Sequence, residues 1–298
     1  MSHPRSAGVT VGETDRLREV ARRIRVEVIR AVNHAQAGHI GGPLSAADIL
    51  AVLYFHILRI RPEEPAWPDR DRFILSKGHS SIALYAAMAL RGYLPVEELL
   101  TLDAVHSRLQ GHPDMTRLPG LDMSTGSLGM GLSAGMGIAL GARLTGRDIR
   151  AFVMLGDGEC QEGEVWEAAM AAPRYGLDNL IAIIDHNRLQ QYGWPGDGPD
   201  GRIPPQVPGE LAAKWSAFGW RVLEADGHDM ATIVNVLEEA TRSDGRPVAV
   251  IAHTVKGKGV SFMEGHYFWH TRAIKPEEFD QAMAELGEPV PDTEGGPR

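Results

Sequence analysis

An aspartate between two glycines is the first feature of this sequence that could do chemistry. In the stretch VMLGDGECQEGEVWEA, residues 153–168, an apolar run ends at Gly156, Asp157 and Gly158, and helix-forming residues follow. Glycines there let the main chain approach a ligand closely and adopt conformations barred to other residues, and a following helix start offers N–H groups to an anion. A carboxylate repels a phosphate unless a cation lies between them, and a hard oxygen ligand suits Mg²⁺. The triplet therefore predicts a phosphate bridged by a metal ion.

A second ligand for this ion follows the next apolar run. That run ends in IIDHNRLQ, so that Asn187 stands thirty residues after Asp157. The spacing equals one strand–helix–strand unit, which places both side chains at the carboxyl ends of neighbouring strands. The side-chain oxygen of Asn187, a main-chain carbonyl near Leu189, phosphate oxygens and water can complete an octahedron. We therefore expect Asp157, Asn187 and Leu189 to hold Mg²⁺.

The sequence contains its own control for this interpretation. The segment GDGPDG, residues 196–201, repeats the triplet and also fits the pattern G-x-G-x-x-G. No strand-like run precedes it and RIPP follows it, so we expect a turn-rich loop there. The context of the first triplet, rather than the triplet itself, makes it informative.

Strand-like and helix-like segments alternate in the second half of the chain. Short apolar runs rich in β-branched residues occupy 151–155, 180–185, 220–226 and 247–255. Helical patterns lie between them, around 161–175, 208–217 and 229–242. This order predicts an α/β fold whose parallel sheet carries helices on both faces. Ligands of such sheets bind beyond the carboxyl ends of the strands.

The first half is expected to supply further helices and one strand. Apolar residues at helical spacing predict a helix from Thr14 to about His34, and Ser45 with Asp48 resembles a capping box for another over 45–58. A strand over 72–75, a helix over 80–92 closed by Gly92, and a long irregular loop over 102–126 follow. Loops of that length inside a compact domain are usually functional.

The segment SLGMGLSAGMGIALGARLTG, residues 127–146, carries repeated glycines. Each glycine costs a helix about 1 kcal/mol relative to alanine, so close packing must offset the loss if the segment is helical. The alternative is a flexible glycine loop. The interleaved Met, Leu and Ile residues favour a tightly packed helix at an interface.

Size and composition predict one large domain. The 298 residues are 43% apolar, and we expect a single domain over 14–287 between flexible ends at 1–13 and 288–298. A net charge of −9 without a Lys/Arg run argues against a nucleic-acid or anionic-membrane partner. Cys160 is the single cysteine, which rules out an intrachain disulfide, and no run resembles a signal peptide or a membrane span. We expect a soluble, cytoplasmic protein.

Four of the twelve histidines stand where an imidazole could act on a ligand. His39, His79 and His112 each adjoin a glycine in a loop-like context, and His270 ends the sequence FWH. Small neighbours expose such rings, which could then transfer protons. None shows the spacing of a zinc site; His266 lies four residues before His270, but the surrounding GHYFWHT is not helical in pattern.

The aspartate–asparagine pattern resembles the diphosphate-binding signature of thiamine diphosphate enzymes. The stretch GDGECQEGEVWEA resembles its transketolase form, and four more stretches match in the family's order: AGHIGGPLSAADIL, ILSKGHSSIALYA, GHPDMTRLPGLDMSTGSLGMGLS and TVKGKGVSFMEGHYFWH. Together they cover most of residues 14–273. Ile40, Met130 and His186 depart from the family pattern; none removes a ligand, although Met130 could retune a subunit contact.

The resemblance implies thiamine diphosphate and Mg²⁺ as cofactors, and it assigns roles to residues of this chain. The four histidines would line the cleft above the thiazolium ring, with His79 and His270 also contacting the cofactor. The other expected cofactor contacts are Gly126 and Leu128 at the aminopyrimidine, Gly156, Gly158, Glu159 and Asn187 at the diphosphate, and Lys256 near the phosphates. The alternative for Lys256 is a solvated loop lysine. Glu162 is either a carboxylate favoured by a helix N-terminus or part of an acidic link between paired active sites.

The resemblance also implies a missing half. Full-length transketolases continue for several hundred residues into a pyrimidine-binding domain, which carries the glutamate that activates the cofactor. We therefore expect the N-terminal subunit of a split transketolase, in an α2β2 assembly with a separate pyrimidine-domain subunit, transferring a two-carbon ketol unit from a ketose (phosphate) to an aldose. The substrate could be an ordinary pentose phosphate or a specialised sugar. The alternatives are the α subunit of a 2-oxoacid dehydrogenase, which is not expected to combine SKGH, GHPDM and STGSLGMGLS, and a regulatory homologue that has lost its chemistry.

Overall fold

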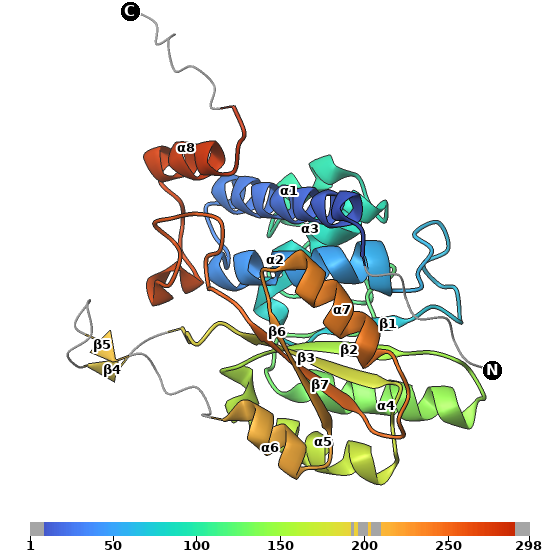
Figure 1. Cartoon of the computed structure of the whole chain (residues 1–298). Coiled ribbons are helices and arrows are strands. Elements are labelled where there is room, and N and C mark those ends of the chain that lie inside the picture. Colours follow the sequence, from blue (N-terminus) through green and yellow to red (C-terminus); the bar gives the residue numbers. More distant parts are fainter. Residues whose placement is uncertain (1–8, 192–193, 196–201, 204–209, 290–298) are drawn as a thin grey trace, which may run out of the picture.

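A five-stranded parallel sheet forms the centre of the protein (Figure 1). The computed structural model describes residues 9–191, 194–195, 202–203 and 210–289. The strands stand in the order β1 (Arg72–Leu75), β2 (Ala151–Gly156), β3 (Leu180–His186), β7 (Val248–His253) and β6 (Arg221–Asp226). Every neighbouring pair runs parallel, so the carboxyl ends of all five strands share one edge. The predicted α/β architecture is confirmed, whereas the second GDG triplet at 196–201 lies outside the described residues.

Helices cover both faces of the sheet. One face carries α1 (Val11–Ala35), α2 (Gly41–Val52), α3 (Ser81–Arg91) and α7 (Met230–Ala240), and the other carries α4 (Met130–Leu144), α5 (Gly163–Arg174) and α6 (Leu211–Ala217). Because side chains alternate along a strand, Ile183 packs into the first core and its neighbour Ile184 into the second. This burial on both faces explains why the strands read as continuous apolar runs.

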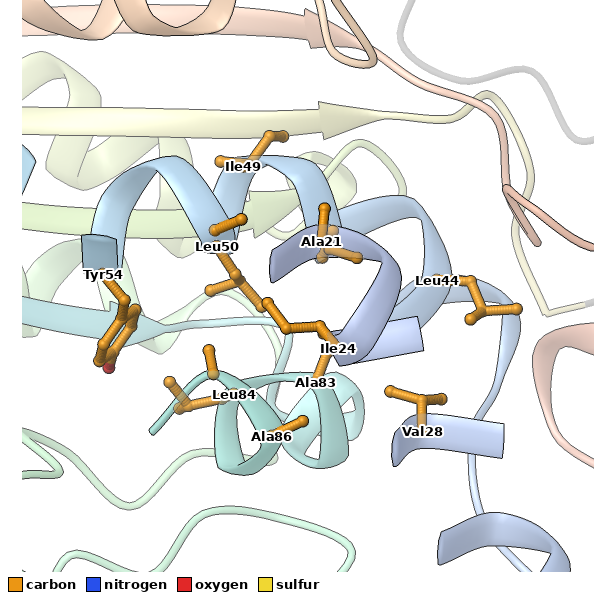
Figure 2. Packing of buried hydrophobic residues seen from close by; sticks show 14 of the residues in the cluster. Ala21, Ile24, Val28, Leu44, Ile49, Leu50, Tyr54, Ala83, Leu84 and Ala86 are labelled. Carbon is orange, nitrogen blue, oxygen red and sulfur yellow. The ribbon is translucent and has the colours of Figure 1, made fainter. Parts of the chain in front are cut away.

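Three helices of the first core, α1, α2 and α3, pack against one another and position the loops next to them. Figure 2 shows Ile24 of α1 among Leu50 of α2 and Ala83 of α3. All three side chains are fully buried. A buried side chain of this kind stabilises the fold by about 1.5–3 kcal/mol, apart from the smaller alanine. The packing holds the segments that precede α2 and α3, which carry His39 and His79.

The remaining elements are short. They are η1 (Leu53–Ile57), η2 (Gly78–Ser80), η3 (Val96–Thr101), η4 (Glu159–Gln161), η5 (Tyr267–His270), α8 (Pro276–Glu285) and the antiparallel strands β4 (Trp194–Pro195) and β5 (Arg202–Ile203). Residues 102–126 contain neither helix nor strand, as the sequence predicts. Within the described part of the chain, no helix has the length and apolar character needed to cross a membrane.

The folded part of the chain extends beyond the expected domain, 14–287, at both ends. Helix α1 begins at Val11 because the side chain of Thr10 caps it, accepting a hydrogen bond of 3.3 Å from the Glu13 amide. Residues 11–13, assigned to the flexible N-terminal segment, therefore form its first turn. Glu288, assigned to the C-terminal tail, pairs with Arg22 at 2.9 Å and so ties the end of α8 to α1.

The predicted capping box at Ser45 is wrong. Helix α2 starts four residues earlier, at Gly41, and continues into the π-helical turn η1. The buried Ser45 hydroxyl donates to Gly42 O at 2.9 Å and to Asp185 Oδ2 at 2.6 Å, while Asp48 pairs with Arg25. The sequence pattern was misleading because both polar side chains have partners from distant parts of the chain.

The glycine-rich segment is a helix, α4, and its glycines face two different surroundings. A Cβ atom at Gly131 would lie 2.3 Å from Ser76 Oγ, and one at Gly135 would lie 2.3 Å from Val153 Cγ2. At Gly137 and Gly141 a Cβ would meet nothing within 4 Å. The first two glycines thus let α4 approach the sheet closely, and the other two lie on its open face.

Because of this difference, replacing glycine by alanine should change the stability of the chain in opposite directions at the two kinds of position. Gly135→Ala should destabilise the chain by about 1–3 kcal/mol because the new methyl group overlaps Val153. Gly137→Ala, two residues away in the same helix, should stabilise it by up to about 1 kcal/mol because alanine is the better helix former. Urea unfolding of the two variants beside the parent measures both changes. Equal shifts of the two unfolding free energies would contradict the packing described here.

Candidate active site

A cavity of about 360 Å³ opens at the carboxyl edge of the sheet. Its walls come from the turns after β1, β2 and β3, the segment before α2, the loop before α4, and the region around η5. Every residue that the sequence analysis assigned to the site lines it: His39, His79, His112, Gly126, Leu128, Gly156, Asp157, Gly158, Glu159, Asn187, Leu189, Lys256 and His270. Residues up to 231 positions apart in sequence, between His39 and His270, therefore meet in one pocket.

The turn after β2 places Asp157 beside the segment that carries Asn187. Strands β2 and β3 are neighbours, and Gly156 stands opposite Asp185. Asp157 is 2% exposed, and its two carboxylate oxygens accept hydrogen bonds from the amides of Gly158 at 2.7 Å and Arg188 at 2.5 Å. The expected approach of the two strand ends is therefore present in the fold.

The glycines of this turn differ from the expectation in their conformation. Neither Gly156 nor Gly158 has a positive φ, and Gly158 has an ordinary φ of −64°. The helix behind them begins only at Gly163, because η4 intervenes and its Gln161 amide bonds to Gly158 O at 3.1 Å. What glycine provides here is space, since a Cβ on Gly158 would lie 3.0 Å from Gln190 Cγ.

The oxygen atoms around Asp157 fit a hard divalent cation. Burial, and then the negative charge of Asp185, raise the pKa of Asp157 to about 7, so a nearby cation would relieve an unfavourable charge. Asn187 contributes an amide oxygen, and Leu189 a main-chain oxygen that now accepts from Lys256 Nζ at 3.3 Å. Among the described residues, no group of three or more His, Cys, Asp or Glu side chains could hold a metal ion. The mixed donor set is instead of the kind that Mg²⁺ takes together with phosphate oxygens and water.

An unpaired donor in the pocket wall fits an anion. The side-chain nitrogen of Gln190 is buried and has no hydrogen-bond partner in the described parts of the chain. It lies against Gly158, within 3.3 Å of the position where a Cβ would stand. Buried donors are rarely left unpaired, so a ligand oxygen at this place would satisfy it. Gln190 is not among the residues predicted from the sequence, although its position just after Leu189 could have indicated it.

The four histidines form one cluster. The ring of His39 lies 5.1 Å from that of His79, 6.1 Å from His112 and 5.2 Å from His270, measured between centroids. His79 and His270 are 5.0 Å apart. His266 is not among the pocket residues, and its ring stacks on Phe268. The structure thus separates the two histidines of GHYFWH.

The three half-buried rings of this cluster, those of His39, His79 and His270, are neutral near pH 7. Burial, followed by neighbouring positive charge, lowers the pKa of His39 to about 4 and that of His270 to about 3. The same causes hold the pKa of His79 well below its usual value. A neutral imidazole has one donor and one acceptor nitrogen, so each ring can hold a hydroxyl or carbonyl group in a defined direction.

Lys256 is buried in the pocket wall, contrary to the alternative of a solvated loop lysine. It is 2% exposed, and burial followed by the charge of Lys77 lowers its pKa to about 8. Its ammonium donates to His270 Nδ1 at 2.7 Å. Because His270 is neutral, its proton then lies on Nε2, and that nitrogen is a donor.

Two acidic side chains next to Asp157 have different surroundings. Glu159 is buried and accepts hydrogen bonds from Ser76 Oγ at 2.5 Å, the Gly129 amide at 2.9 Å and the Gly156 amide at 3.0 Å. It therefore connects the turn after β2 to the start of the glycine-rich helix. Glu162 is exposed directly before α5 and lines the pocket, a position that suits both interpretations given for it.

A buried ion pair between Lys77 and Asp185 was also not predicted from the sequence. Lys77 lines the pocket, and Asp185 precedes Asn187 in the chain, with His186 between them. Each stands at the end of an apolar run, FILSK and IAIID, where a charged side chain is unexpected. That position was the available signal for both residues.

Comparison with known sequences decides the family. Residues 17–292 match the family described as "Transketolase, thiamine diphosphate binding domain". The chain belongs to the transketolase family. The resemblance found in the sequence motifs is thus confirmed, and thiamine diphosphate is the cofactor of the matching domain.

The similar transketolases fall into two lengths. The chain is 44% identical over 270 residues to "6-deoxy-6-sulfo-D-fructose transketolase subunit SqwG" of Clostridium sp. (strain MSTE9), covering 91% of this chain and 96% of that protein. It is 41% identical over 266 residues to a protein of Phocaeicola vulgatus named as one subunit of an apulose-4-phosphate transketolase, covering 89% and 92%. The crystal structure of transketolase from Campylobacter jejuni superposes with a TM-score of 0.83 at 34% identity, covering 91% of this chain but 43% of that one. This member of the transketolase family therefore matches proteins named as subunits over nearly their whole length, and the solved transketolase over less than half.

Proposed function

We propose that this chain is the diphosphate-binding subunit of a two-subunit transketolase, which transfers a two-carbon ketol unit from a ketose phosphate to an aldose. The observation that carries the proposal is one pocket that joins the oxygen donors of Asp157 and Asn187 to four clustered histidines. The near-complete coverage of relatives named as transketolase subunits supports the division into two chains. The similar proteins described above are named as transketolases or their subunits, which favours ketol transfer over the 2-oxoacid dehydrogenase alternative.

The residues present fit a diphosphate with its cation. Bound thiamine diphosphate supplies a carbanion at its thiazolium ring, a chemistry that no side chain offers. Asp157, Asn187 and the Leu189 carbonyl would hold Mg²⁺, and Gln190 would donate to a phosphate oxygen. Lys256 Nζ lies within hydrogen-bond distance of Leu189 O, so its ammonium group would also lie near the expected phosphates.

The histidine cluster would bind and orient the sugar. Neutral rings at His39, His79 and His270 can donate to a ketose carbonyl and accept from its hydroxyl groups without burying further charge. Proton transfer to or from a hydroxyl as the C2–C3 bond breaks would fall to a ring within hydrogen-bond reach. His112 is the exposed member of the cluster and so the one that faces incoming substrate.

The pyrimidine-domain partner would cover the open side of this arrangement. Leu128 and Met130, at the pocket rim and the start of α4, are 39% and 44% exposed, and Leu144 at the other end of α4 is 80% exposed. An exposed apolar stripe beside the open glycines of α4 is typical of a protein–protein interface. We propose that the pyrimidine-domain subunit packs there in a cytoplasmic α2β2 assembly and contributes most contacts to the sugar phosphate.

Reconstitution tests the proposed function. The purified chain, its pyrimidine-domain partner and their mixture are assayed with xylulose 5-phosphate and an aldose acceptor, and in parallel with pyruvate. We expect ketol transfer in the mixture and background rates from either protein on its own. Ketol transfer by this chain without its partner would refute the division, and turnover of pyruvate would favour the dehydrogenase alternative. Absence of Mg²⁺-dependent cofactor binding in calorimetry would favour the regulatory homologue.

A further inference from the structure

The ion pair of Lys77 and Asp185 is buried behind the pocket. Lys77 is 1% exposed and Asp185 is fully buried. Lys77 follows strand β1 in the chain. Its ammonium donates hydrogen bonds to Asp185 Oδ2 on β3 and to Gly42 O of α2, the latter at 3.1 Å. Removing two charges from water is unfavourable unless further hydrogen bonds satisfy them. The surroundings of Asp185 supply these bonds.

Asp185 collects donors from separate elements of the fold. Its carboxylate accepts from Ser45 Oγ of α2 at 2.6 Å, from Thr254 Oγ1 just after β7, and from Asn187 Nδ2 at 3.2 Å. With the Lys77 ammonium, every one of these contacts is a donor that faces the carboxylate. In this setting Asp185 is an acceptor of hydrogen bonds from all of its partners.

An acceptor at this place decides which way the Asn187 amide faces. The amide nitrogen must point to Asp185, because the amide oxygen would repel the carboxylate. The amide oxygen is then directed away from Asp185, and the Leu189 amide donates to it at 3.1 Å. Asn187 lines the pocket beside Asp157, where a cation needs an oxygen and would be repelled by an NH₂ group.

We propose that the Lys77–Asp185 pair is a positioning device for Asn187, which locks the amide so that its oxygen faces the cation site. The inference rests on the proposed function, since it requires the cation site at Asp157 and Asn187. Lys77, Ser45 and Thr254 hold the carboxylate in place, and Asp185 orients the ligand. Losing a partner that orients a metal ligand typically weakens metal affinity about 10- to 100-fold.

The affinity of the chain for Mn²⁺ tests the positioning of Asn187 without an activity assay. The free Mn²⁺ signal in electron paramagnetic resonance gives the dissociation constant for the full chain at saturating thiamine diphosphate. The variant Lys77→Met/Asp185→Asn removes both charges together, so neither is left buried alone. We expect about 10- to 100-fold weaker Mn²⁺ binding, with a thermal unfolding midpoint that shows the variant to be folded.

A rescue distinguishes orientation from a general loss of structure. Asn187→Asp in the parent should weaken Mn²⁺ binding, because it places a second carboxylate against Asp185. Added to Lys77→Met/Asp185→Asn, the same change should restore most of the affinity, because a carboxylate presents an oxygen whichever way it is turned. A folded double variant with the parent's affinity, or a folded triple variant without recovery, would overturn the inference. Asp157→Ala tests the cation site separately: loss of Mn²⁺ binding there upholds the proposed function even if the inference fails, and unchanged binding overturns both.

Discussion

Asp157→Ala is expected to abolish retention of thiamine diphosphate by this chain. The substitution removes the one carboxylate that the proposed cation site contains, so the cation that would balance the charge of the diphosphate loses a ligand. The loss should exceed the 10- to 100-fold typical of changes to the outer partners of a metal ligand, that is, more than about 3 kcal/mol. Calorimetric titration with thiamine diphosphate at saturating Mg²⁺ measures it.

The stability of the same variant provides the control. The folded chain raises the pKa of Asp157 to about 7, above the ordinary value of 3.8, so ionising this group opposes folding at higher pH. Removing it should therefore leave the cofactor-free chain no less stable than the parent at pH 8. A variant that is folded and still binds the cofactor as the parent does would refute the cation site. A large drop in stability would contradict the charge environment described for Asp157.

His112→Ala is expected to reduce ketol transfer about 10²- to 10⁴-fold while cofactor retention stays near that of the parent. His112 lies 6.1 Å from His39 and is the exposed member of the histidine cluster. Its ring is thus placed to act on the sugar rather than on the diphosphate. The measurement compares turnover of the reconstituted enzyme with calorimetric cofactor binding.

His266→Ala is the matched control for this prediction. His266 does not line the pocket and stacks on Phe268, so its removal should leave both turnover and retention close to the parent values. Equal loss of cofactor retention in the variants of His112 and Asp157 would contradict the division of roles between histidines and carboxylate.

The meeting of the site residues in one pocket was predictable from the sequence, because the topology brings their segments together. Asp157 and Asn187 each follow an apolar strand, and right-handed crossovers place successive strands of such a sheet side by side with their ends at one edge. Three of the histidines could be selected because each has a glycine neighbour, and all four because they lie in stretches that match the family motifs. Predicting which residues meet in the pocket therefore required no knowledge of side-chain packing.

What the sequence could not provide depends on contacts between distant elements. Ser45 looked like a helix cap because the pattern S-x-x-D is local, whereas its partner Asp185 lies 140 residues away. Lys77 was not predicted to belong to the site, since burial of a charge is possible only where a partner from another strand meets it. Likewise Gly158 was expected to need an unusual conformation, but its lack of a side chain makes room for Gln190.

A crystal structure of the chain with thiamine diphosphate and Mn²⁺ tests the central claim most directly, because anomalous scattering locates the manganese independently of the rest of the density. We predict a single peak within about 2.0–2.4 Å of an Asp157 carboxylate oxygen and the Asn187 side-chain oxygen, with diphosphate oxygens completing the coordination. A diphosphate bound in the pocket with its manganese away from these two side chains would contradict the account.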